Sequence, residues 1–167
     1  MKVANIFLGR DVEIDLSSSV NNVKIGDNVK IAKRCSVYGG FDNLLEIGAS
    51  TYIGMNSILN GYAAKLKIGR NVSIAQNVNI MVDSGPNGSP VMQRVFPVEK
   101  KQVTIGDHVW VGAGSIIMPG VSLGDYCVVA ANSYVNRSFE AFTIIGGNPA
   151  RIIRTFTEEE KLKILGE

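Results

Sequence analysis

The chain has a single histidine, His108, the side chain best suited to move a proton near neutral pH. It lies six residues after a stretch without regular pattern, residues 85–102, so we expect it to reach any groove that this stretch borders. Two readings stay open for His108: a general base, or a corner residue with a structural hydrogen bond.

Trp110 follows His108 by two residues and is the only tryptophan. Both residues fall outside the positions expected to face a core, so both should point outward. An outward tryptophan on a polar surface indicates a ligand or a neighbouring subunit that covers it, and packing under residues 85–102 is the equal alternative.

The two cysteines, Cys35 and Cys127, are too few to form a disulfide framework. Both occupy small, inward positions of the repeat, so we expect buried thiols of the core rather than nucleophiles. The sequence contains no phosphate-binding glycine loop, and no Ser/His/Asp order that fits a hydrolase.

Composition restricts the class of protein. With 167 residues, 46% of them hydrophobic and 19% charged, the chain is long enough for one globular domain. A net charge of +2 and the lack of a basic stripe argue against a nucleic-acid partner. Residues 1–10 have no apolar targeting core and no stretch approaches eighteen apolar residues, so we expect a cytoplasmic protein that does not insert into membranes.

The elements that must position these side chains follow from an internal repeat of six residues. Aliphatic residues recur at every sixth position over most of the chain: Ile25, Ile31, Val37; Ile47, Ile53, Leu59; Ile68, Ile74, Ile80; Ile105, Val111, Ile117, Leu123, Val129 and Val135. The residue after each is mostly small, and the fourth residue after each is mostly small or β-branched.

This spacing predicts short strands that each send one aliphatic side chain into a narrow core. The small residue that follows suits a corner where a Cβ atom would be crowded. Three hexads form one triangular coil, and no coil can bury its apolar side alone, so the coils must stack. Five coils at the sheet spacing of about 4.8 Å give a prism on the order of 24 Å tall.

Interruptions of the repeat all fall after the third strand of a coil. The spacing is 22 residues from Ile25 to Ile47, 21 from Ile47 to Ile68 and 37 from Ile68 to Ile105. The last includes the loop 85–102, whose Val91, Met92, Val95 and Phe96 are too apolar to remain in water. A long loop on a rigid scaffold is a common place for function.

Three segments carry a family resemblance: Ile105-Gly-Asp-His-Val-Trp-Val-Gly-Ala-Gly-Ser, Met118-Pro-Gly-Val, and Ile145-Gly-Gly-Asn-Pro-Ala-Arg. With the tandem hexads, they resemble the hexapeptide-repeat acyltransferases over nearly the whole chain, most of all the maltose- and galactoside-type and polysaccharide O-acetyltransferases. The resemblance implies an all-β left-handed parallel β-helix, and a homotrimer with active sites between subunits. The hydrophobic loop would then pack on a neighbouring subunit.

The resemblance also implies acetyl-CoA as the acyl donor, held along the last coils. Carried over by position, the pantetheine arm would meet Ala113, Ala131 and Asn136, beside Trp110. Arg151 and Arg154 would meet the phosphates, for which guanidinium groups are well suited, or would be solvated arginines. No metal is expected, since the zinc enzymes of this family need several histidines in each chain.

One departure from the family concerns the base. Relatives carry a histidine just after the strand that here reads Ile80-Met-Val, whereas this chain continues Asp83-Ser-Gly-Pro-Asn-Gly. Asp83 is therefore a second candidate base or orienting group, if an apolar site raises its pKa. Asn56 lies where sugar acetyltransferases keep an asparagine beside the reacting groups, and a turn residue is the alternative.

We therefore expect one domain, residues 1–156, with an insertion at 85–102, followed by residues 157–167 as a short helix or tail. Thr157 with Glu160 fits a capping box, and Leu162 and Leu165 would pack the helix on the prism. The function expected is transfer of an acetyl group to a sugar hydroxyl of a glycan or small-molecule acceptor. N-acetylation of an amino sugar, and a non-catalytic scaffold that binds coenzyme A or a partner, are the alternatives.

Overall fold

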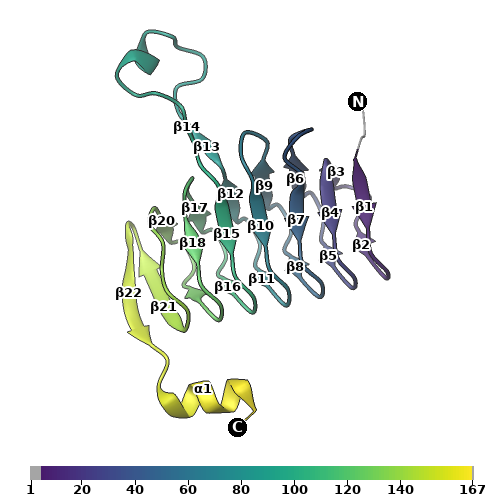
Figure 1. The fold of residues 1–167 in the computed structure, drawn as a ribbon, viewed down its shortest axis with the longest axis vertical. Coiled ribbons are helices and arrows are strands. Elements are labelled where there is room, and N and C mark those ends of the chain that lie inside the picture. The colour runs from purple at the N-terminus through teal and green to yellow at the C-terminus, as the bar shows by residue number, and fades with distance from the viewer. Residues whose placement is uncertain (1–4, 167) are drawn as a thin grey trace.

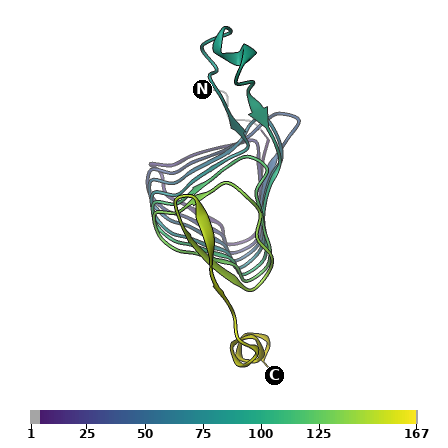
Figure 2. The same cartoon turned by 90° about the vertical axis from the view of Figure 1, so that its left-hand side faces the viewer.

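The computed structural model describes residues 5–166. Its strands form a left-handed parallel β-helix with three flat sheets, here named A, B and C in the order in which the chain visits them. Figure 2 looks along the stack of coils and shows the triangular cross-section.

Each sheet receives one strand from every coil. Sheet A contains β1 (Ile6–Leu8), β4 (Val23–Ile25), β7 (Leu45–Ile47), β10 (Leu66–Ile68), β15 (Val103–Ile105) and β18 (Ser122–Leu123). Sheet B contains β2 (Glu13–Ile14), β5 (Lys30–Ile31), β8 (Tyr52–Ile53), β11 (Ser73–Ile74), β16 (Trp110–Val111), β19 (Val128–Val129), β21 (Thr143–Gly147) and β22 (Ala150–Thr155). Sheet C contains β3 (Ser19–Asn21), β6 (Ser36–Gly39), β9 (Ile58–Gly61), β12 (Asn79–Met81), β17 (Ile116–Ile117) and β20 (Tyr134–Val135).

The residues of the hexad repeat form the core, as predicted. Ile47 is in register with Ile25 on one side and Ile68 on the other, and Ile105 follows Ile68 across β10 and β15. All of these are at most 3% exposed. Because the strands are parallel and in register, equal positions of successive coils stack into continuous columns of aliphatic side chains.

The prism has six coils, one more than the repeat count gave. The additional coil is β1–β2–β3, whose Leu8, Ile14 and Val20 keep the six-residue spacing. It lies at one end of the stack, and among residues 5–166 no further strand pairs with it on its outer side. Leu8 is consequently 51% exposed, although it is in register with the buried Ile25.

Between the sheets, the chain turns at three corners, named here A–B, B–C and C–A. The turn is tight at the A–B and B–C corners, where one residue adopts a positive φ at each A–B corner and at each B–C corner from the second coil on. These residues are Asp11, Asn28, Ser50, Asn71, His108, Tyr126 and Phe142 at A–B, and Arg34, Asn56, Asn77, Gly114 and Asn132 at B–C. Asparagine tolerates this left-handed conformation better than most residues, which accounts for its frequency there.

All long excursions leave from the C–A corner, as the spacing predicted. The longest begins with β13 (Asp83–Ser84), which pairs antiparallel with β14 (Glu99–Lys100), and contains the 3-10 turn η1 (Met92–Arg94). Figure 1 shows this loop standing away from the prism on one side.

The helix α1 (Glu158–Leu165) extends from the opposite side of the prism (Figures 1 and 2). Its capping box is present: the Thr157 side chain accepts a hydrogen bond from the Glu160 backbone N–H, and the Glu160 side chain accepts one from the Thr157 backbone N–H. The expectation that Leu162 and Leu165 pack on the prism is wrong, because they are 45% and 53% exposed. The short link after β22 carries the helix away from the coils.

Candidate functional site

The three side chains considered for catalysis lie at three different corners of the prism. His108 is at an A–B corner, Asn56 at a B–C corner, and Asp83 just beyond a C–A corner, at the foot of the loop. A whole sheet separates each pair. Within one chain, therefore, these residues do not form a common site.

His108 is stacked in a column of aromatic rings along the A–B corner. Its ring lies 4.8 Å from that of Tyr126 at 5°, and Tyr126 lies 4.7 Å from Phe142 at 11°. The expectation that His108 reaches the groove beside the loop is not met within the chain, because the loop leaves from a different corner. The surroundings of His108 therefore match the second interpretation of the sequence, in which it is a structural residue at a corner.

Asn56 also occupies a tight corner. Its φ is 60°, its backbone N–H donates to the Lys33 carbonyl at 2.9 Å, and its side-chain oxygen accepts from Arg34 Nε at 2.8 Å. The position and contacts of Asn56 are those of a turn residue, and its amide oxygen already accepts a hydrogen bond from Arg34.

Asp83 lies among polar side chains at the foot of the loop. It begins the loop hairpin and is half-buried, and its Oδ1 accepts a hydrogen bond from Asn60 Nδ2 at 2.8 Å. Tyr38 lies close by: burial raises the pKa of its hydroxyl, and the negative charge of Asp83 raises it further. Lys100 faces Asp83 across the hairpin. A carboxylate, an amide and a phenol thus meet at the foot of the loop.

Above this cluster, the loop exposes much apolar surface. Val91 is 67% exposed, Met92 47%, Val95 70% and Phe96 59%. Val95 and Phe96, together with Met118 of the next coil, line a hollow of about 290 Å³ beside Ser84 and Glu99. Exposed apolar surface of this kind is typical of sites that bind a ligand or another protein chain.

The residues assigned to the pantetheine arm lie on the last coils but on two corners. Ala113 and Ala131 are stacked at the B–C corner, where the Asn132 N–H donates to the Ala113 carbonyl at 2.8 Å. Asn136 follows β20 at the C–A corner and is exposed. Trp110 points outward from sheet B as predicted and is 57% exposed, between Ser73 and Val128.

Arg151 and Arg154 lie on β22, and both are exposed. Arg154 is already paired, since its two terminal nitrogens donate to the two Glu160 carboxylate oxygens at 2.7 and 2.9 Å. This pairing holds the pKa of Glu160 at about 2, through the hydrogen bond from Arg154 first and that from the Thr157 N–H second. A phosphate group at Arg154 would have to replace this carboxylate.

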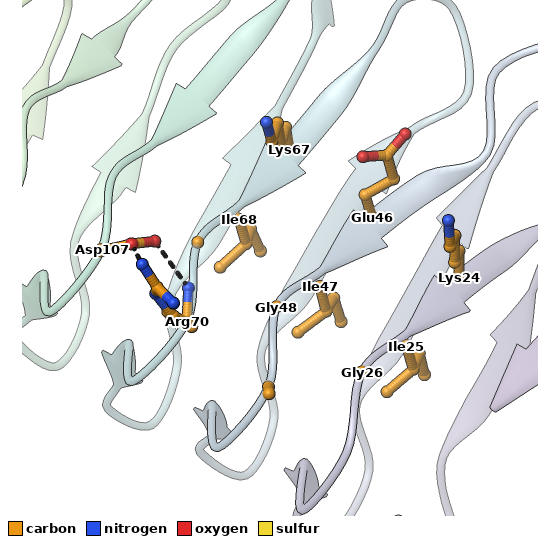
Figure 3. Close-up of a pocket in the computed structure, with 12 residues that line it drawn as sticks. Lys24, Ile25, Gly26, Glu46, Ile47, Gly48, Lys67, Ile68, Arg70 and Asp107 are labelled. Atoms are coloured by element: carbon orange, nitrogen blue, oxygen red, sulfur yellow. Dashed lines mark hydrogen bonds and ion pairs between the residues drawn. The ribbon is translucent and has the colours of Figure 1, made fainter. Parts of the chain in front are cut away.

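A separate groove of about 360 Å³ crosses the outer face of β4, β7 and β10 (Figure 3). Lys24, Glu46 and Lys67 stand in register along it. Lys65 donates to Glu46 at 2.9 Å and, with the charges of Lys67 and Lys24, lowers the pKa of this carboxyl. Glu46 is thus a paired surface carboxylate rather than a base.

The family model described as the hexapeptide repeat of succinyl-transferase matches residues 102–137. The putative acetyltransferase YvoF of Bacillus subtilis is 33% identical over 67% of this chain and 74% of its own length. The chain belongs to the hexapeptide-repeat acetyltransferase family. The galactoside O-acetyltransferase of Escherichia coli is 31% identical over 82% of this chain. A solved structure of AntD, an N-acyltransferase from Bacillus cereus, superposes over 95% of this chain with 27% identity and a TM-score of 0.76. That structure is a complex with dTDP and 3-hydroxybutyryl-CoA.

The chain does not span the full length of all these relatives. It matches 66% of the galactoside O-acetyltransferase and 61% of the putative acetyltransferase YJL218W of Saccharomyces cerevisiae, to which it is 41% identical. A solved galactoside acetyltransferase in complex with coenzyme A superposes over 82% of this chain with 29% identity and a TM-score of 0.71.

For this member of the hexapeptide-repeat acetyltransferases, the residues that sequence reasoning missed are Asn60 and Tyr38. Neither lies in a recognisable motif, and Asn60 is 23 residues from Asp83. The only available signal was the repeat itself: Tyr38 and Asn60 follow the inward Val37 and Leu59, so both are outward and stacked.

Other predictions for this family member concern the core and metals. Cys35 and Cys127 are buried as expected, at 3% and 0% exposure, and burial raises the pKa of the Cys127 thiol. Within residues 5–166 there is no group of three or more His, Cys, Asp and Glu side chains placed to hold a metal ion. The same part of the chain has no helix that is both long and apolar enough to cross a membrane.

Proposed function

We propose that this protein transfers an acyl group, most simply acetyl, from the thioester of an acyl-coenzyme A to a hydroxyl group of a sugar. The observation that carries the proposal is that AntD and a galactoside acetyltransferase, on which nearly all or most of the chain superposes, were both solved with coenzyme A or its thioester. O-acetyltransferases acting on galactosides and in lipopolysaccharide biosynthesis are among its relatives.

Asp83 is the proposed general base. Its carboxylate takes the proton from the acceptor hydroxyl as the oxygen attacks the thioester carbonyl carbon. The new C–O bond forms, the C–S bond breaks, and the proton passes to the departing thiolate of coenzyme A. Asp83 suits this role because it is half-buried, hydrogen-bonded to Asn60, and at the foot of the apolar loop, which would limit the access of water to a thioester bound there.

The donor is proposed to lie along the last coils, with the pantetheine arm against Ala113 and Ala131 and near Trp110. Its nucleotide phosphates would bind Arg151, and would bind Arg154 after displacing the Glu160 carboxylate from it. The B–C corner that carries Ala113 and the C–A corner that carries Asp83 are on opposite sides of sheet C. The donor-binding and proton-accepting parts therefore come together most directly between two copies of the chain.

A homotrimer with such shared sites is part of the proposal. The loop residues Val91, Val95 and Phe96 supply the apolar surface that a second copy would cover. We expect light scattering to give a trimer, and Phe96→Asp to dissociate it because burying a charge in an apolar contact is costly. Leu16→Asp, at a fully exposed position of the first coil, is the control that should stay trimeric; a monomeric wild type refutes the trimer.

N-acylation of an amino sugar is the second candidate. AntD, an N-acyltransferase, covers 95% of the chain, more than the 82% of the solved galactoside acetyltransferase. The proposed base serves both acceptors, since an amine also loses a proton during transfer. A scaffold without catalysis is the remaining alternative, because the family's loop histidine is replaced here by the Asp83-Ser84-Gly85 segment.

Thiol release from acetyl-CoA tests the proposal directly. The purified protein is assayed with a panel containing galactosides, maltose, lipopolysaccharide sugars and glucosamine, so that the accelerating acceptor also distinguishes O- from N-transfer. We expect Asp83→Asn to lower kcat about 10²- to 10⁴-fold, as loss of a general base does. We expect His108→Ala to leave kcat near wild type, because its ring is committed to the stack with Tyr126.

Each outcome bears on a different part of the proposal. No thiol release with any acceptor supports the scaffold and refutes catalysis with this acceptor class. Release that survives Asp83→Asn but not His108→Ala makes His108 the base, reached from a neighbouring copy.

A further inference from the structure

Asn60 joins the foot of the loop to the body of the prism through both ends of its amide. Its Nδ2 donates to Asp83 Oδ1 at 2.8 Å, and its Oδ1 accepts from the Tyr62 backbone N–H at 3.0 Å. Asn60 lies on β9, within the C sheet, and is half-buried.

These two contacts fix which way the amide faces. A backbone N–H only donates, so the side of Asn60 that faces Tyr62 must be the oxygen, and the NH₂ group must face Asp83. Asp83 Oδ1 is then an acceptor in this contact. The contact with Asn60 occupies Oδ1 and leaves the other carboxylate oxygen, Oδ2, outside it.

The backbone around Asn60 keeps Asp83 at a fixed place. The Val82 N–H donates to the Asn60 carbonyl at 3.2 Å, and the Lys101 N–H donates to the Val82 carbonyl at 2.8 Å. The outgoing strand of the loop is thereby bonded to β9, and the returning strand is bonded to the outgoing one. Asp83 is held relative to the coils even where the rest of the loop protrudes.

We propose that Asn60 is the positioning residue of the reaction: it engages Oδ1 of Asp83 and leaves Oδ2 as the oxygen that accepts the substrate proton. This inference rests on the proposed function, in which Asp83 is the base. It assigns to Asn60 a role that acts only through Asp83, which distinguishes it from a residue that merely supports the fold.

A double-mutant cycle tests this role. Initial rates of thiol release from acetyl-CoA, with whichever acceptor of the panel gives the highest wild-type rate, yield kcat and KM for Asn60→Leu, Asp83→Asn and the double variant. Asn60→Ala repeats the test with a smaller side chain, and urea unfolding midpoints show which variants are folded. Asn79→Leu on the neighbouring strand β12 is the matched control, because this asparagine is also half-buried but its side chain makes no hydrogen bond within residues 5–166.

We expect Asn60→Leu to lower kcat about 10- to 100-fold, as loss of a hydrogen bond to a charged group does, with KM nearly unchanged. Asn79→Leu should keep wild-type kcat. The double variant should be no slower than Asp83→Asn alone, because Asn60 has nothing left to position.

Three results would overturn the inference or its basis, and they are distinguishable. Losses that multiply in the double variant make Asn60 structural. Wild-type kcat in both folded Asn60 variants, with Asp83→Asn still impaired, refutes the inference and leaves the proposed function intact. Wild-type kcat in Asp83→Asn refutes Asp83 as the base, whatever Asn60 does.

Discussion

At the scale of single residues, the corners of the prism show what the hexad requires. From the second coil on, the position after the aliphatic residue at the B–C corner alternates between alanine and glycine: Ala32, Gly54, Ala75, Gly112 and Ala130. A Cβ atom added to Gly54 would lie 2.5 Å from the carbonyl carbon of Ala75 in the next coil. The repeat therefore specifies small residues because neighbouring coils approach closely there, as the sequence predicted.

Gly54→Ala should consequently destabilise the protein, by about 1–3 kcal/mol, as crowding in a well-packed interior does. The matched control is Gly88→Ala in the loop, where an added Cβ meets nothing within 4 Å. Urea unfolding of both variants measures the difference. Equal midpoints would show that the coils move apart at little cost.

At the scale of elements, the sequence predicted the strands, the corner of the excursions and the helix cap, because each follows from a local rule. Hexad spacing defines which residues face inward, and Thr157 with Glu160 defines the helix start. For the proposed site, the sequence offered Asp83 as a candidate but gave no sign of Asn60, which donates a hydrogen bond to it. His108 lies at a different corner from the one where the loop begins. Contacts between coils depend on the lengths of intervening loops, which a local pattern does not contain.

The attachment of α1 depends on the same Glu160 that completes the cap. The hydrogen bonds from Arg154 first and from the Thr157 N–H second lower the Glu160 pKa from 4.5 to about 2, so these contacts stabilise the helix above pH 4.5 and are lost as the pH falls from 4.5 towards 2. We expect NMR of the Glu160 carboxyl carbon to titrate well below pH 4.5, and the α1 amides to shift with it.

The Arg154→Met variant is the comparison for this titration. Without the guanidinium, the Glu160 midpoint should rise towards 4.5, while the capping contact with Thr157 keeps part of the shift. A wild-type midpoint near 4.5 would mean that the exposed ion pair does not persist in solution.

At the scale of the whole molecule, each coil is supported only by its neighbours. Ile14 on β2 and Ile74 on β11 occupy the same column of sheet B, with the same side chain and the same inward direction. Ile74 is fully buried between two coils, whereas Ile14 lies in the first coil and is half-buried. In a stacked array, stability is approximately a sum of contacts between adjacent units, so the two positions should differ.

Ile74→Ala should therefore cost about 2–5 kcal/mol of unfolding free energy, the usual range for a buried isoleucine, and Ile14→Ala distinctly less. The reason is that a cavity inside the stack keeps its walls on both sides, while one at the open end is filled by water. Urea unfolding, together with amide hydrogen exchange of the first coil, measures both effects. Equal costs at the two positions would show that the end coil is covered in solution, by residues or by another copy, as fully as the middle ones.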